Sequence, residues 1–332
     1  MNQSPLFAFI GKQFIKLILL VIAISIVTFG LVAMSPIDPV QMNVGQAAYV
    51  NLSAEKRAQL EEYWGVDTPV TEKYAHWAEG VLHGDWGTSL RFNRPVMDVV
   101  GERFLNSLAL MATAWILSGV FGLILGILAG KYRGTLIDKI IQGYSLTLAA
   151  VPTFWLGLLM LMVFAVWLHL FPMGMSVPIG MADADVSLWD RIYHMILPAL
   201  TLSVIGVANI ALHTREKVID IMESDYFLFA IARGETKNQA VRHHCYRNLL
   251  LPAITLQFAS INEIFGGSVL IEQVFSYPGI GQAAVTAGLG GDAALLVAIA
   301  IISAVFVFTG NLIANILYGV VDPRIRRGQG IG

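Results

Sequence analysis

The stretch SDYFLFAIARGETKNQAVRHHCYRNLLLP, Ser224 to Pro252, is a polar segment between long apolar runs. Its first part carries four residues at helical spacing, Tyr226, Phe229, Ala230 and Arg233. Ser224 or Asp225 stands where a helix cap is expected, and Gly234 follows as a left-handed stop. These residues predict a short helix that ends in a tight turn.

The second part of this stretch predicts another short helix. Thr236 and Gln239 have the spacing of a capping box. One apolar side of the helix is formed by Val241, Cys245 and Leu249. Pro252 is expected to end the helix. The stretch is therefore predicted to form a helix–glycine–helix elbow. By its residues alone, the elbow is either a docking surface for another protein or an amphipathic segment lying on lipid headgroups.

The composition indicates a protein surrounded by membrane lipid. Of the 332 residues, 56% are hydrophobic and 13% are charged, against about 25% charged in soluble domains. The net charge of −2 and the lack of a basic cluster argue against nucleic acid as a partner. A single cysteine excludes an internal disulfide framework.

Long apolar runs predict an all-α polytopic membrane protein with six transmembrane helices. The first run, Leu17 to Met34, is longer than the apolar part of a signal peptide, which favours an uncleaved anchor. The other predicted spans cover residues 104–130, 140–168, 195–213, 253–275 and 293–321. Pro152 is expected to kink the third span, which is longer than the bilayer core requires.

The apolar runs divide the chain into four predicted regions. Residues 1–34 form a tail and the first span, 35–103 an extracytoplasmic loop subdomain, 104–321 the membrane core with the elbow region 214–252, and 322–332 a tail. Two amphipathic helices are expected in the subdomain, because apolar residues recur at helical spacing at Leu60, Tyr63 and Trp64 and at Val70, Tyr74, Trp77 and Val81. Glycine-rich residues 276–292 are expected to form a flexible outer turn.

The basic residues predict the orientation of the chain. Lys and Arg number two before the first span, three between spans two and three, six in the elbow region and three in the tail, but one and none in the short loops after spans three and five. By the positive-inside rule, both termini and the elbow are cytoplasmic.

Within the predicted spans, two features suggest function. Gly122, Gly126 and Gly130 form a small-residue stripe that permits close approach of a neighbouring helix, from this chain or another subunit. Glu263 is the one acidic residue that the sequence predicts to lie deep in a span. It either lines a polar pathway or is a structural carboxylate bonded to Asn262 or to a partner helix.

Several kinds of chemistry are not indicated. No G-x-x-x-x-G-K-[ST] phosphate loop occurs, so the chain is not expected to hydrolyse ATP or to be an enzyme. His243, His244 and Cys245 are consecutive, and consecutive helical side chains point about 100° apart, so they do not converge on one metal ion. No catalytic residues, metal site or cofactor are predicted in this chain.

The elbow and other motifs resemble those of a known family. Ala230, Ala232 and Gly234, followed by Arg247-Asn248 and Leu251-Pro252, resemble the EAA loop of bacterial ABC importer permeases of the dipeptide/oligopeptide/nickel branch. Five further stretches match that branch in the same order: Gly84 to Ser89, Val151 to Trp155, Leu197 to Leu202, Glu272 to Gly279 and Asp322 to Arg326. The resemblance covers nearly the whole chain and points to the first, B-type permease subunit.

The resemblance implies a type I ABC importer permease fold in the bacterial cytoplasmic (inner) membrane. The expected partners are a second, non-identical permease, two ABC ATPase subunits that bind ATP, and an extracytoplasmic solute-binding protein. The resemblance assigns coupling to the ATPases to the elbow residues, Tyr226, Ala230, Ala232, Gly234, Arg247 and Pro252. Glu263 and Asn262 are the candidates for the substrate pathway.

Di- and oligopeptides are the expected substrates, because they are the commonest cargo of this branch. Nickel or a nickel chelate is the alternative, suggested by Glu263 and a methionine-rich loop at 169–194. A secondary transporter driven by an ion gradient is a more distant alternative. It is expected to carry several intramembrane charges and inverted repeats, which are not recognised here.

Overall fold

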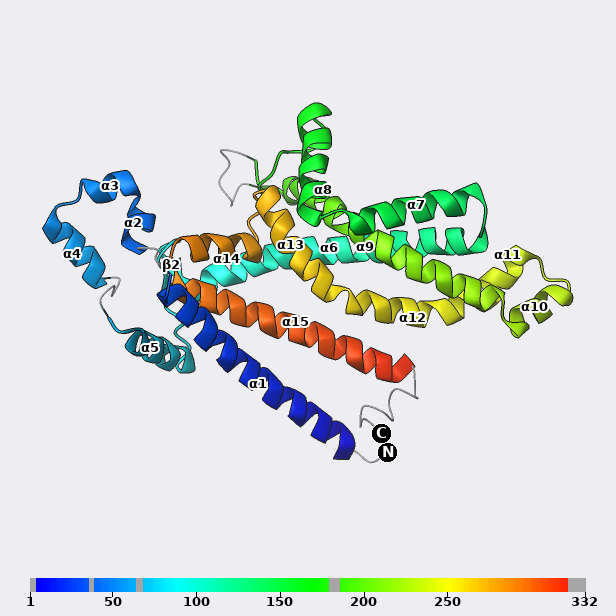
Figure 1. Cartoon of the computed structure of the whole chain (residues 1–332), viewed down its shortest axis with the longest axis horizontal. Helices are drawn as coiled ribbons and strands as arrows, with labels where there is room; N and C mark the ends of the chain where they lie inside the picture. Colours follow the sequence, from blue (N-terminus) through cyan, green and yellow to red (C-terminus); the bar gives the residue numbers. More distant parts are fainter. Residues whose placement is uncertain (1–3, 36–38, 64–67, 179–185, 322–332) are drawn as a thin grey trace.

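The computed structural model describes residues 4–35, 39–63, 68–178 and 186–321. Figure 1 shows an elongated helical molecule, with small helices at one end of the long axis, the elbow at the other and long helices between them. By length and composition, four helices within these residues are able to cross a membrane: α1 (Ser4–Ala33), α6 (Val96–Lys131), α9 (Leu188–Met222) and α15 (Ala293–Val321). Two bent helix pairs raise the number to six when each pair is one span.

The third predicted span is broken rather than kinked. Helix α7 (Leu136–Ala150) is followed by α8 (Thr153–Met160) and the π-helix η1 (Leu161–Trp167), at an angle of 110°. Val151 and Pro152 between them are extended, with ψ of 127° and 134°. Because proline disfavours the helical region for the residue before it, Val151 leaves the helix and the chain turns.

The fifth predicted span is continuous with the elbow. Helix α12 (Tyr246–Ala259) meets α13 (Ile261–Val274) at a bend of 46°. The expectation that Pro252 ends the elbow helix is wrong, because Pro252 lies inside α12. A proline is tolerated within a membrane helix where neighbouring groups satisfy the freed carbonyl.

Two other boundaries differ from the prediction. Helix α9 continues to Met222, so the fourth span does not end at 213 and the region 214–252 begins within a helix. The expected flexible turn at 276–292 contains a helix, α14 (Ile280–Leu289). Ile280, Ala283 and Ala287 of α14 are buried against α6 and α15, so packing orders a segment that its glycines suggested was irregular.

The segment before α6 contains the small helices at one end of Figure 1. They are α2 (Pro39–Val44), α3 (Gln46–Val50), α4 (Ala54–Tyr63) and α5 (Val70–Leu82), followed by the antiparallel strands β1 (Thr88–Ser89) and β2 (Arg94–Pro95). Helices α4 and α5 form where two amphipathic helices are expected, with Trp64 outside the described residues, but only α5 has a distinct apolar side. In α5, Tyr74 and Trp77 pack on Phe29 of α1.

The core of the molecule is the contact between α6 and α9. Gly122, Gly126 and Gly130 are buried on α6. A Cβ atom on Gly126 would lie 2.4 Å from Cβ of Thr214 and 2.7 Å from the carbonyl oxygen of Ala211, both in α9. The predicted small-residue stripe therefore serves an internal helix pair.

Candidate functional site

The elbow has the local structure that its sequence predicts. Helix α10 (Asp225–Ala232) ends before Gly234, whose φ of 98° is left-handed. In the next helix, α11 (Lys237–Ala240), the backbone N–H of Gln239 donates to Thr236 Oγ1 and the backbone N–H of Thr236 donates to Gln239 Oε1, at 3.4 and 2.9 Å. The capping box is confirmed. Ser224 is the N-cap of α10 by position, but its hydroxyl donates to the Ile221 carbonyl and makes no side-chain cap.

A small apolar core fixes the elbow to the long helices. Phe227 and Ala230 of α10 are 3% and 5% exposed. They pack with Val218 and Ile221 of α9, and the same cluster contains Ile127, Ala240, Val241 and Leu249. The sequence pattern did not identify Phe227 as the residue that anchors α10, although its spacing of three from Ala230 places both on one helix face. The π-helix η3 (Val241–Cys245) joins the elbow to α12 without a loop, so the elbow is packed against the ends of α6 and α9 and is covalently continuous with α12.

The outer side of α10 is apolar and exposed. Its exposed large residues are Tyr226, Leu228, Phe229 and Ile231, at 45%, 55%, 63% and 39%. Of the predicted coupling residues, Tyr226, Ala232 and Gly234 are exposed, whereas Ala230 is buried. Arg247 and Pro252 lie in α12, and their side chains are outside the described part of the structure. We call the four exposed apolar residues of α10 the elbow patch.

Charged groups stabilise the elbow and the helix ends beside it. The Glu235 carboxylate lies 3.3 Å from His244 Nε2 and 3.5 Å from His243 Nδ1. The hydrogen bond with His244 is the main cause that lowers the pKa of Glu235 below its ordinary value. Asp138 of α7 accepts two hydrogen bonds from the Arg215 guanidinium of α9, at 2.6 and 3.0 Å, in an almost fully buried pair. No cluster of three or more His, Cys, Asp or Glu residues able to hold a metal occurs in the described residues.

The two candidate pathway residues lie next to the bend between α12 and α13. Glu263 is exposed and accepts a hydrogen bond from Asn209 Nδ2 of α9 at 3.2 Å. Asn262 is also exposed and donates to Asn311 Oδ1 of α15 at 2.9 Å. Of the two partners considered for a structural Glu263, the described contacts include a neighbouring helix, α9, and not Asn262, because each side chain reaches a different helix.

The sequence singled out Glu263 as the one acidic residue deep in a span. The described helices also contain buried acidic residues that the sequence did not single out. Glu272 of α13 is 0% exposed and Asp138 of α7 is 1% exposed. The Glu272 carboxylate accepts from Ser107 Oγ at 2.5 Å and from the backbone N–H groups of Gly281 and Gln282 at 2.7 and 3.1 Å. It therefore caps α14 from another helix.

The comparisons with known proteins agree with this arrangement of helices. Residues 122–327 match the family described as binding-protein-dependent transport system inner membrane component, and residues 6–111 match the N-terminal part of the corresponding membrane component. The chain belongs to this family of transport-system membrane components. Family membership places the protein in the bacterial cytoplasmic membrane as a multi-pass transport subunit, not an enzyme.

Full-length relatives have similar sequences. The chain is 35% identical over 319 residues to the oligopeptide transport system permease protein AppB of Bacillus subtilis, covering 96% of this chain and 99% of the relative. It is 33% identical over 323 residues to the dipeptide transport system permease protein DppB of Escherichia coli, covering 92% and 94%. The glutathione transport system permease protein GsiC of Salmonella choleraesuis is 30% identical over 318 residues, covering 96% and 98%. The resemblance to the peptide branch of the family is thereby confirmed.

Proposed function

We propose that this chain is one of two transmembrane subunits of an ATP-driven importer of di- and oligopeptides. The names of the relatives support peptides as the substrates. In this proposal, a solute-binding protein delivers the peptide to the outer face and two separate ATPase subunits act on the cytoplasmic face. A second, homologous permease completes the pathway, because six spans are few to enclose a hydrophilic substrate.

The observation that carries the proposal is the elbow patch. Figure 1 places α10 and α11 at the end of the molecule opposite α2 to α5. There, Tyr226, Leu228, Phe229 and Ile231 are exposed on a helix whose other side is anchored by Phe227 and Ala230. An exposed apolar patch is typical of a protein or membrane interaction site, and we infer a protein-docking site for the elbow. Six basic residues in the elbow region support a cytoplasmic location for this patch under the positive-inside rule.

The packing of the elbow suggests how force enters the spans. Because α10 shares a core with α6 and α9 and is followed by α12, displacement of the elbow moves three long helices together. Rigid-body movement of packed helices is a known form of two-state switching. We infer that closure of the ATPases rotates these helices and alternates access to the pathway beside Glu263 and Asn262.

The test uses the complete importer reconstituted in lipid vesicles with its binding protein. In a Leu228→Ser/Phe229→Ser variant, loss of the two most exposed apolar side chains of the elbow patch is expected to reduce both copurification of the ATPases and peptide uptake by at least tenfold. Leu289→Ser is the matched control, because Leu289 is 59% exposed on α14, far from the elbow. The proposed coupling is wrong if the elbow variant retains the ATPases and transports peptide as the control does.

A further inference from the structure

A polar stripe runs along one side of α9 toward the elbow. Asn209, His213 and Lys217 are spaced by four residues and therefore lie on one helix face. Both His213 and Lys217 are exposed, whereas Ile210, Ala211 and Val218 elsewhere on the helix surface are buried. Asn209 and His213 fall in the predicted fourth span, where polar side chains are costly against lipid and indicate an aqueous or protein-lined surface. Lys217 lies one turn beyond that predicted span, on the side that the basic residues predict to be cytoplasmic.

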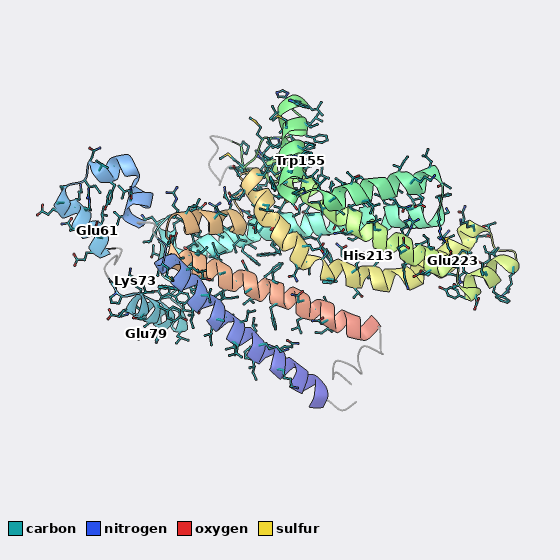
Figure 2. The ribbon with its side chains drawn as sticks, viewed as in Figure 1. Glu61, Lys73, Glu79, Trp155, His213 and Glu223 are labelled. Carbon is teal, nitrogen blue, oxygen red and sulfur yellow. The ribbon has the colours of Figure 1, made fainter. Side chains whose placement is uncertain are left out.

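The stripe borders a groove between α9 and α12. The groove has a volume of about 190 Å³ and is lined by His213, Thr214, Lys217, Leu249, Ala253 and Leu256. Figure 2 marks His213 in the part of α9 that runs beside α12. The lining is polar on the α9 side and apolar on the α12 side, so the groove offers both a charged contact and an apolar one.

The two ends of the stripe have opposite charge. At one end, Glu263 is held by the Asn209 amide, and the described part of the chain provides no basic side chain paired with it. At the other end, the Lys217 ammonium lies 3.9 Å from the Asp220 carboxylate, and both side chains are exposed, at 49% and 68%. An exposed pair at this distance is worth little, so Lys217 is available to another anion.

The length of the stripe on α9 matches a short peptide. Asn209 and Lys217 are eight residues apart, which is about 12 Å along the helix axis at about 1.5 Å per residue. An extended peptide gains about 3.5 Å per residue, so the charged termini of a peptide of about two to four residues lie roughly 7–14 Å apart. A longer peptide in this orientation would have its carboxylate beyond Lys217.

We propose that this stripe is a transient binding site for a short zwitterionic peptide, in which Glu263 binds the ammonium group and Lys217 the carboxylate. His213 and the apolar wall of the groove contact the segment between the two termini. This inference rests on the proposed import of peptides and adds the residues of this chain that recognise the two charged ends.

Charge reversal in the reconstituted importer tests the site. Glu263→Lys and Lys217→Glu each replace an attraction with a repulsion, and each is expected to reduce dipeptide uptake at saturating binding protein by at least tenfold, the change for about 1.4 kcal/mol. The double reversal is expected to restore uptake to within about threefold of the unmodified protein, since a zwitterion also binds end for end. Restoration does not require contact between the two side chains, because the bound peptide joins Glu263 of α13 to Lys217 of α9.

Two controls separate the inference from the proposed function and from misfolding. Glu79→Lys on α5 and Lys139→Glu on α7 change the same charges on exposed residues outside the stripe, and both are expected to transport normally. Copurification with the other subunits verifies assembly of every variant. Failure of the unmodified importer to transport any peptide would refute the proposed function. Normal uptake in the single reversals would refute the stripe alone. A third outcome is that the single reversals assemble but take up less peptide, and the double reversal does not restore uptake. That result also refutes the stripe as a peptide site and indicates that the charges bind a partner subunit or lipid instead.

Discussion

The close contact of α6 with α9 makes a quantitative prediction for Gly126→Ala. The added Cβ atom would lie 2.4 Å from Cβ of Thr214 and 2.7 Å from the carbonyl oxygen of Ala211. Neither neighbour is the flexible end of a long side chain, so one helix must shift. Overpacking of this kind costs about 1–3 kcal/mol.

Gly101→Ala is the matched control, because Gly101 lies in the same helix and nothing is within 4 Å of the position of its Cβ. Replacement of a helical glycine by alanine is favourable by about 1 kcal/mol in both variants, so this gain cancels in their difference. The remaining difference in the free energy of unfolding is the packing cost, about 2 kcal/mol at the centre of the overpacking range. For 332 residues, an unfolding entropy of about 2.1 cal/mol/K per residue gives about 1.4 °C per kcal/mol, so Gly126→Ala should melt roughly 3 °C below Gly101→Ala.

The assay is thermal unfolding of the purified protein in one detergent, followed by tryptophan fluorescence. Both variants are measured at the same protein concentration, so that association does not bias the comparison. Equal melting temperatures for Gly126→Ala and Gly101→Ala would show that α6 and α9 are not packed as closely as described, and would refute the interpretation of the glycine stripe.

Three other substitutions test individual contacts. Asp138→Asn leaves the nearly buried Arg215 with only the exposed Glu216 carboxylate. It is expected to cost about 3 kcal/mol, measured by the same melting assay, and an unchanged melting temperature would contradict the pair. Gly279→Ala places a Cβ atom 2.2 Å from the carboxyl carbon of Glu272 and displaces that carboxylate from its hydrogen-bond donors. The free energy of unfolding is expected to fall by roughly 2 kcal/mol or more. Faster hydrogen exchange in α14 is the measurement specific to this contact. The pKa of Glu235 is lowered in the folded protein, so its charge stabilises the elbow at a pH above the ordinary carboxyl pKa. This stabilisation is lost as the pH falls through the lowered pKa. Glu235→Gln should therefore remove the acid-dependent change in hydrogen exchange of the elbow amides, and an unchanged pH profile would argue against the histidine contacts.

The sequence by itself determined the class of protein and the local structure of the elbow. Long apolar runs permit few alternatives to membrane helices, because backbone groups in lipid must be hydrogen-bonded within the chain. The capping box at Thr236 and the turn at Gly234 depend on residues only a few positions apart, so the sequence pattern contains all that decides them. The glycine spacing on α6 likewise predicted a close helix contact.

Only the tertiary structure decided which helices meet and which polar groups are buried. The stripe at Gly126 faces α9 of the same chain, and the α14 segment is helical because its small residues pack against α6 and α15. The sequence drew attention to Glu263, whereas Glu272 of the same helix is fully buried, with hydrogen-bond donors from α6 and from the first turn of α14. Such contacts join residues far apart in the chain, so they depend on how the helices pack and are not contained in any local pattern of residues.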